Sequence, residues 1–137
     1  MQKPVHVLAD STMLFSALLF NGPERRVLNS GAYLFYTSDF NVLELTDVFK
    51  RKQVFSEQEA IQVIQSQPVL VMPLAIYEQK LPMADEIIGG RDKKDVPLLA
   101  LALSVDNDGI WSSDKHFREI AGLEIRIWSS KELLEFL

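Results

Sequence analysis

Four acidic side chains stand at positions where they are able to act together. Asp10 and Asp114 each follow a short apolar run and precede a helical one, and Asp95 directly precedes an apolar helix. Glu44 lies in an apolar row of another helix. Two unit charges ~5 Å apart repel each other by about 3 kcal/mol at an effective dielectric constant near 20. If these carboxylates meet, they therefore need a bound cation or shared protons.

The choice of cation follows from the absence of cysteine. With no cysteine, disulfides and thiolate metal sites are excluded, and a metal must be held by oxygen atoms or by the two histidines. Hard oxygen ligands prefer Mg²⁺ or Mn²⁺ to zinc. Such ions support phosphodiester hydrolysis, since they lower the pKa of a bound water and stabilise negative charge on phosphate. The predicted metal ligands, which are also the predicted catalytic residues, are Asp10, Glu44, Asp95 and Asp114.

Each of these acids also has a purely structural interpretation. Asp10, Asp95 and Asp114 are all suited to capping a helix, because Asp is among the preferred residues at that position. For Asp95 the pattern predicts that the carboxylate accepts hydrogen bonds from the first helical turn, where Pro97 lacks a donor at no cost. The joint arrangement of the three caps is what favours a shared site.

The elements that must position these acids alternate between strands and helices. Short β-type runs are predicted at 4–9, 33–37, 69–72, 109–113 and 125–127. Helices are predicted at 13–20, 24–29, 38–52, 98–103 and 114–121. Two more are predicted to begin at a capping box at Ser56 and at Ser130. Residues 75–88 are predicted to be helical in part, with a break at Pro82. This alternation is typical of parallel strands joined by right-handed crossovers.

The predicted fold class is therefore α/β, a three-layer sandwich with a central parallel sheet of four to five strands. In such sheets the functional crevice lies at the carboxyl ends of the strands, where the strand order reverses. Asp10 and Asp114 follow strands and fall at these ends. At 137 residues the chain is long enough for one domain, which we expect to span residues 1–137.

Composition excludes several classes of protein. Hydrophobic residues make up 47% and charged residues 24%, values that fit a globular protein and argue against long disorder. No signal peptide is recognisable at the amino end, and no apolar run approaches the roughly 20 residues of a membrane helix. We therefore expect a cytoplasmic protein without a membrane partner.

The distribution of basic residues modifies the meaning of the net charge. A net charge of −5 argues against a nucleic-acid partner, because phosphate binding depends on Lys and Arg. Eight of the fourteen basic residues, however, lie close in sequence to the predicted metal ligands. A basic rim around an acidic centre suits a polyanion, and a set of solvated faces is the equal alternative. The candidate substrate contacts are Lys50, Arg51, Lys93, Lys94, Lys115 and His116.

Two motifs carry a family resemblance. Asp-Val-Pro-x-x-Ala-Leu-Ala-Leu, from Asp95, and Ile-Trp-Ser-x-Asp-Lys-x-Phe, around Asp114, resemble runs of the PIN-domain family, metal-dependent nucleases that include the VapC-type toxins. Asp10, in Leu-Ala-Asp-Ser-Thr-Met-Leu-Phe-Ser-Ala-Leu, matches the first acid of that family, and Glu44 in Val-Leu-Glu-Leu matches the second. Met13 and His116 depart from the family pattern, which often has Val or Ile at the first position and a further acid at the second.

The resemblance implies a metal-dependent endoribonuclease, with RNA as substrate and Mg²⁺ or Mn²⁺ as cofactor. It further implies the toxin of a toxin–antitoxin pair, an antitoxin protein as partner, and a homodimer formed through the early helices 13–20 and 61–64. One alternative is a PIN-like nucleic-acid-binding domain with little or no catalysis. Another is a receiver-like signalling domain, but that class requires an Asp after the third strand, where Val71-Met72-Pro73 offers none.

Overall fold

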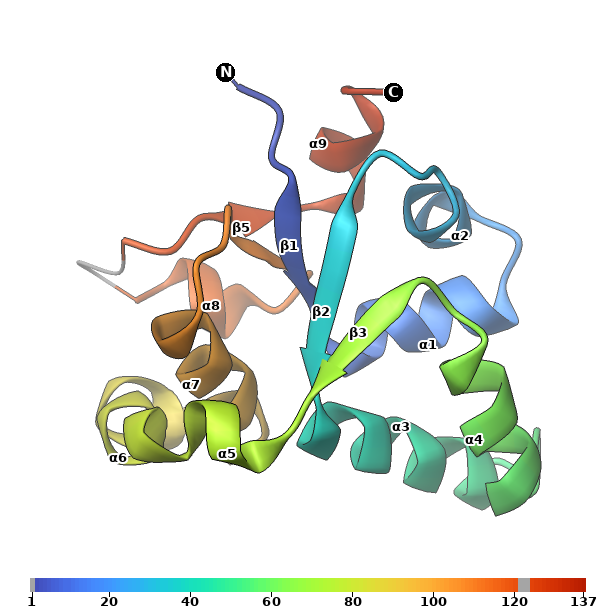
Figure 1. The fold of residues 1–137 in the computed structure, drawn as a ribbon, viewed down its shortest axis with the longest axis horizontal. Coiled ribbons are helices and arrows are strands. Elements are labelled where there is room, and N and C mark those ends of the chain that lie inside the picture. The colour runs from blue at the N-terminus through green and yellow to red at the C-terminus, as the bar shows by residue number, and fades with distance from the viewer. Residues whose placement is uncertain (1, 121–123) are drawn as a thin grey trace.

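Within the residues that the structure describes, five parallel strands form the central sheet. A computed structural model describes residues 2–120 and 124–137 (Figure 1). The strands are β1 (His6–Ala9), β2 (Leu34–Ser38), β3 (Val69–Met72), β4 (Ile110–Trp111) and β5 (Ile127–Trp128), arranged in the order β3-β2-β1-β4-β5. All four pairings are parallel. The predicted α/β class with a central parallel sheet is confirmed.

Alternating side chains of β1 supply both cores. Val7 and Ala9 belong to one hydrophobic cluster and Leu8 to the other, and all three are fully buried. Successive side chains of a strand point to opposite faces, so an apolar run without alternation requires cover on both sides. The central position of β1 in the sheet explains why Val7, Leu8 and Ala9 are all apolar.

One face of the sheet is covered by helices from the first half of the chain and from its end. Residues of each of these helices pack in the cluster that includes Val7, Phe35 and Trp111. They are α1 (Ser11–Leu19), α2 (Pro23–Leu28), α3 (Asp39–Arg51), α4 (Glu57–Gln65) and α9 (Ser130–Leu134). The predicted capping box at Ser56 is present and begins α4.

The opposite face is covered by the middle of the chain. Its elements are α5 (Leu74–Tyr77), a 3-10 turn (Glu78–Lys80), α6 (Leu81–Ala84), a π-helical turn (Asp85–Gly89), a second 3-10 turn (Lys93–Asp95), α7 (Val96–Ser104) and α8 (Lys115–Arg118). Residues Leu98 to Ala102 of α7 are all buried, as the continuous apolar run predicts. Figure 1 shows α5, α6 and α7 together beside the lower ends of the strands.

Several predicted boundaries are wrong. The α-helix is interrupted by the 3-10 turn that precedes α6, and not at Pro82 itself. Pro82 lies in the first turn of α6, where its missing N–H is harmless. β4 and β5 contain two residues each, shorter than predicted, and β5 begins at Ile127 rather than at residue 125. α8 ends at Arg118, and the predicted last residue of that helix, 121, lies outside the described residues.

The order in which successive strands are added to the sheet reverses at β1. The chain moves from β1 outward to β2 and β3, then returns across the other face to β4 and β5 on the far side of β1. The carboxyl end of β1 is therefore the topological switch point, where open α/β sheets bind their ligands. Asp10 directly follows β1 at this point. No helix among the described residues is long and apolar enough to cross a membrane.

Candidate metal centre

Asp10 is the buried acid at the switch point. Its Oδ1 accepts a hydrogen bond from the Met13 N–H at 2.8 Å, which caps α1, and its Oδ2 accepts one from Ser112 Oγ. Only 7% of the residue is exposed. The pKa of Asp10 is raised to about 6, chiefly by burial and also by the charges of Asp114 and Glu44, while its two hydrogen bonds oppose the rise. The carboxylate is thus held firmly in a place that disfavours its charge.

The pKa of Asp95 is raised more than that of Asp10. The pKa of Asp95 is raised to about 9, chiefly by burial and also by its neighbours Asp114, Asp92 and Asp10. Its Oδ2 is buried and has no hydrogen-bond partner within residues 2–120 and 124–137. An unpaired buried acceptor of this kind normally costs ~1–3 kcal/mol, and more for a charged group. A cation at this oxygen would remove that cost.

The predicted capping role of Asp95 is wrong. Its side chain accepts no capping hydrogen bond, because its backbone is already helical, with φ −84° and ψ −11°. The 3-10 turn Lys93–Asp95 runs directly into α7, so the chain enters the helix one turn earlier than predicted. Asp92 caps that turn instead, accepting a hydrogen bond from the Lys94 N–H at 3.0 Å. The Asp95 carboxylate is left available for a ligand.

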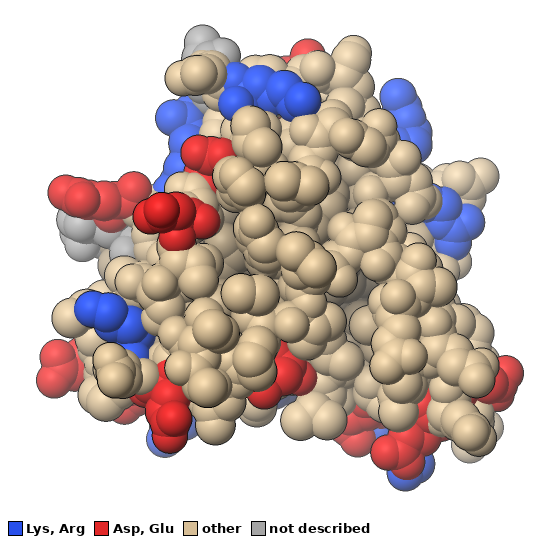
Figure 2. Space-filling model, viewed as in Figure 1, with Lys and Arg blue, Asp and Glu red and all other residues tan. Residues whose placement is uncertain are grey.

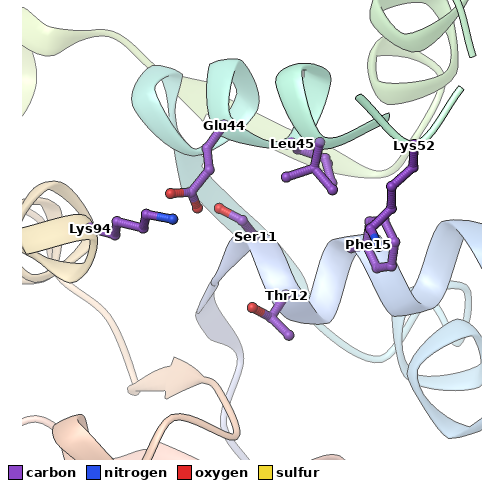
Figure 3. A pocket seen from close by; sticks show the side chains of 8 residues that line it. Ser11, Thr12, Phe15, Glu44, Leu45, Lys52 and Lys94 are labelled. Carbon is purple, nitrogen blue, oxygen red and sulfur yellow. The ribbon is translucent and has the colours of Figure 1, made fainter. Parts of the chain in front are cut away.

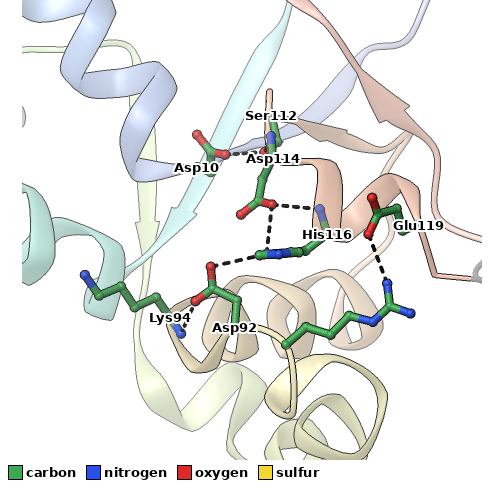
Figure 4. Close-up of polar contacts among 8 residues, drawn as sticks. Asp10, Asp92, Lys94, Ser112, Asp114, His116 and Glu119 are labelled. Atoms are coloured by element: carbon green, nitrogen blue, oxygen red, sulfur yellow. Dashed lines mark hydrogen bonds and ion pairs between the residues drawn. The ribbon is translucent and has the colours of Figure 1, made fainter.

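Four side chains converge beside Asp10. One donor atom from each of Asp92, Asp95, Asp114 and His116 lies within 4.8 Å of the donors of the other three. Asp114 Oδ1 accepts a hydrogen bond from the His116 N–H at 2.8 Å and lies 3.2 Å from His116 Nδ1. Figure 4 shows the carboxylates of Asp114 and Asp92 on either side of the imidazole ring, with Asp10 above them beside Ser112.

These donors fit a divalent cation. Three carboxylates and one imidazole lie together, and two of their atoms, Asp95 Oδ2 and His116 Nδ1, are buried without a hydrogen-bond partner in the described chain. The neighbouring charges of Asp114, Asp92 and Asp10 are all acidic, and all raise the pKa of Asp95. The chemistry of the donor set therefore matches that of a cation site.

Glu44 lies at the edge of this group. It is not among the four clustered donors, and it lines a pocket with Ser11, Thr12 and Lys94. In Figure 3 its carboxylate points from α3 toward Ser11 and the end of the Lys94 side chain. Its charge contributes to the raised pKa of Asp10, so the two acids are electrostatic neighbours. The structure brings Asp10, Asp95 and Asp114 together and places Glu44 beside them.

A family model described as a PIN domain matches residues 8–136. The chain belongs to the PIN-domain family. Among solved structures, the protein is similar to VapC20 of Mycobacterium tuberculosis, described as a sarcin-ricin loop cleaving toxin, with a TM-score of 0.62 and 16% sequence identity. That similarity covers 88% of this chain and 98% of the other. Curated protein sequences gave no match.

Two supporting residues of this PIN domain are absent from the set of predicted site residues. Ser112 is fully buried, donates to Asp10 and accepts from the Asp114 N–H at 3.0 Å, so it links two of the acids. Asp92 looks like a solvated loop acid in sequence, but it contributes to the four-donor cluster. A signal existed for Ser112, because it directly follows β4 and lies two residues before Asp114.

The predicted substrate contacts are distributed unevenly around the PIN-domain acids. Lys94 lines the pocket of Glu44, together with Lys52, which the predicted set omits. Lys50 and Arg51 instead form surface ion pairs, with Glu57 at 3.8 Å and Asp47 at 3.0 Å. Lys93 borders a separate hollow near α6, Lys115 is exposed on α8, and His116 belongs to the acidic cluster.

Proposed function

We propose that this PIN domain is a metal-dependent endoribonuclease that uses Mg²⁺ or Mn²⁺. The observation that supports this most directly is the buried, unpaired Asp95 Oδ2 within a group of acids at the switch point of the sheet. Asp95 and Asp114 would hold the ion, with Asp10 and Glu44 next to them. A divalent cation bound there supplies positive charge for the phosphate oxygens and lowers the pKa of water.

The remaining work of the site falls to the side chains of the chain itself. Ser112 and the Met13 N–H fix both oxygens of Asp10, so this acid keeps one orientation. Fixed carboxylates orient water and cation more precisely than mobile ones, since little reorganisation is left for the reaction. Burial of Asp10 also excludes bulk water from its side of the site.

Lys94 and Lys52 are the proposed RNA contacts. Both line the pocket next to Glu44, and Phe15 lines it beneath Lys52, whose Nζ lies 6.0 Å from the ring centre of Phe15. Lysine binds phosphate as a point charge, and an aromatic ring offers a surface for base stacking. The pocket therefore provides a route along which RNA would approach the acids (Figure 3).

The test is cleavage of labelled single-stranded and hairpin RNA by metal-stripped protein, before and after addition of Mn²⁺ or Mg²⁺. We expect cleavage only with metal, and Asp10→Asn or Asp95→Asn should lower the rate by at least about 100-fold, since even supporting residues of metal sites cost 10–100-fold. Asp106→Asn is the matched control, because this exposed acid precedes β4 at the opposite edge of the sheet. Equal loss in all three variants would contradict the assignment.

The same experiment separates the nuclease from a domain that only binds nucleic acid. A binding-only domain would slow the migration of RNA in a gel-shift assay with and without metal, and it would give no cleavage products in either case. The nuclease predicts strand scission that requires the metal and the acids. Intact RNA in every condition, with binding unaffected by Asp95→Asn, would favour the alternative.

We also propose that the protein is the toxin of a toxin–antitoxin pair and forms a homodimer. The likeness to the VapC20 toxin supports the first proposal. Induced expression in bacteria should arrest growth, Asp95→Asn should abolish the arrest, and a small protein encoded immediately upstream should relieve it. For the dimer, the apolar residues of α1 and α4 that are buried in the core are Met13, Leu14, Ala17, Ala60 and Ile64. Phe20, the residue after α1, and Ile61 of α4 are exposed at 59% and 40%. Light scattering tests the mass.

A further inference from the structure

His116 places a ring nitrogen among the carboxylates of the candidate metal centre. Its Nδ1 lies 3.2 Å from Oδ1 of Asp114 and 3.6 Å from Oδ2 of Asp92. The Nδ1 atom is buried although the side chain as a whole is 31% exposed. Figure 4 shows the ring lying between these two carboxylates, so one edge of the imidazole is surrounded by negative charge.

The contact between His116 and Asp114 is close without being a hydrogen bond. At 3.2 Å the atoms are within reach, but Nδ1 has no hydrogen-bond partner in the part of the chain that the structure describes. A neutral imidazole carries a lone pair on one of its nitrogens. With that lone pair on Nδ1, the nitrogen and the carboxylate oxygens would repel each other, whereas a cation shared among them would attract all three.

The spacing of the donors agrees with a shared cation. Ligand atoms of a six-coordinate ion bound at ~2.1 Å lie between about 3 and about 4.2 Å from each other. The two distances from His116 Nδ1, 3.2 Å and 3.6 Å, fall within this interval. All four donors of the cluster lie within 4.8 Å of one another, so a small adjustment brings the widest pair into range.

The backbone holds these donors in place before an ion arrives. The His116 N–H donates to Asp114 Oδ1 at 2.8 Å, which fixes the start of α8 against that carboxylate. The Lys94 N–H donates to Asp92 Oδ1 at 3.0 Å. The other oxygen of Asp92, Oδ2, therefore faces the imidazole ring of His116. Ligands oriented by such secondary contacts bind metal more tightly, because less freedom is lost on binding.

We propose that His116 Nδ1 is a direct ligand of the cation, together with Asp92, Asp95 and Asp114, and that this nitrogen makes the centre prefer a divalent transition-metal ion such as Mn²⁺ to Mg²⁺. The inference rests on the proposed function, because it concerns the ion of the same centre. Mg²⁺ binds oxygen ligands and keeps several waters, whereas imidazole is a ligand that transition metals favour. His116 thereby decides between the two ions that the four acids alone leave open.

The test measures the ion itself rather than catalysis. Metal-stripped full-length protein is titrated with Mn²⁺, and binding is followed by the loss of the free Mn²⁺ signal in electron paramagnetic resonance, with Mg²⁺ as competitor. Pulsed spectra of the bound Mn²⁺ then report whether a histidine nitrogen couples to it. The variants are His116→Asp, which replaces nitrogen by oxygen, and His6→Gln, which removes the other histidine of the sequence. His6 stacks on Tyr36 at the opposite end of β1.

Nitrogen coupling should appear in the wild type and in His6→Gln and should be absent in His116→Asp. The ratio of Mn²⁺ to Mg²⁺ affinity should fall by at least about tenfold in His116→Asp, the lower limit for a change near a bound metal. Circular dichroism of His116→Asp shows whether it folds. If it does not, the wild-type spectrum alone decides, since His6→Gln assigns any remaining coupling to His116.

Three results would overturn the inference: bound Mn²⁺ without nitrogen coupling, coupling that disappears in His6→Gln instead, or no Mn²⁺ binding at all. The first two leave the nuclease proposal intact if RNA is still cleaved. Nitrogen coupling from His116 in a protein that cleaves no RNA would support the ligand and contradict the nuclease. The failure of one proposal is thus distinguishable from the failure of the other.

Discussion

Asp10→Asn should make the metal-free protein more stable at neutral pH, even though it removes a predicted catalytic group. Burial raises the pKa of Asp10 from its usual 3.8 to about 6. One pKa unit corresponds to ~1.4 kcal/mol, so the ionised carboxylate costs the folded state about 3 kcal/mol. Asparagine carries no charge and caps a helix about as well as aspartate.

Part of that gain is offset by a lost hydrogen bond. Asp10 accepts bonds with both oxygens, from the Met13 N–H and from Ser112 Oγ, whereas asparagine has one oxygen. A lost hydrogen bond costs about 1 kcal/mol, which leaves a net stabilisation of about 2 kcal/mol. Because the folded-state pKa is raised, the penalty is absent well below 3.8 and complete above about 6. The advantage of asparagine should therefore be present at about pH 7.5 and disappear at about pH 4.

The assay is urea unfolding in chelator at the two pH values, followed by tryptophan fluorescence. Trp111 and Trp128 are both buried, with exposed fractions of 0% and 2%, so unfolding should change their emission strongly. Added Mn²⁺ should stabilise the wild type by about 2.7 kcal/mol at 100 times its dissociation constant, and Asp10→Asn much less.

Asp108→Asn provides a control of opposite sign. Hydrogen bonds from the His6 and Val5 N–H groups, at 2.9 Å and 2.8 Å, lower the pKa of Asp108, so its charge stabilises the fold at neutral pH. That variant should lose stability where Asp10→Asn gains it. Asp10→Asn could instead be destabilised by about 1 kcal/mol at both pH values, as expected for a lost hydrogen bond alone. That result would refute the claim that the buried, ionised Asp10 carboxylate destabilises the metal-free fold.

Three further predictions concern other parts of the protein. Burial raises the pKa of Asp95 to about 9, so the metal-free fold retains a proton that the unfolded chain releases, and its urea midpoint should fall as pH rises from about 4 to about 9. Asp95→Asn should flatten that fall. Lys94→Met should raise the KM for RNA by about tenfold, equivalent to ~1.4 kcal/mol, and leave Mn²⁺ affinity unchanged. Gly109→Ala should lower the free energy of unfolding by about 3 kcal/mol or more, because Gly109 has φ 130° and a Cβ would lie 2.4 Å from the Arg126 carbonyl oxygen.

Each of these three predictions has a control variant or a result that would contradict it. A pH profile that Asp95→Asn leaves unchanged would assign the proton to another group. Lys50→Met should change KM less than twofold, about 0.4 kcal/mol, because Lys50 pairs with Glu57 outside the pocket. An equal effect of the two lysine variants would indicate general charge attraction. Gly22→Ala should be nearly neutral, because no atom lies within 4 Å of the added Cβ.

Local sequence rules predicted the elements that carry strong periodic or capping signals. The Ser56 capping box, the buried run of α7 and the Asp10 cap all occur as expected. The same rules failed for β4 and β5, which have two residues each and are too short to show a period. They failed for Asp95 because a 3-10 turn, which is set by packing of the preceding segment, moved the start of the helix.

The sequence by itself determined the chemistry available to this protein: several acids at the ends of strands and helices, two histidines and no cysteine. Only the tertiary structure decided which of them meet. Ser112 reaches Asp10 across 102 positions of sequence, because parallel pairing of β1 and β4 brings both strand ends to one edge. The same pairing draws His116 into the acidic cluster while Glu44, on a helix of the other layer, stays at its border. Residue type and spacing are local properties, whereas distance between side chains depends on strand order, and strand order is settled by packing of the whole chain.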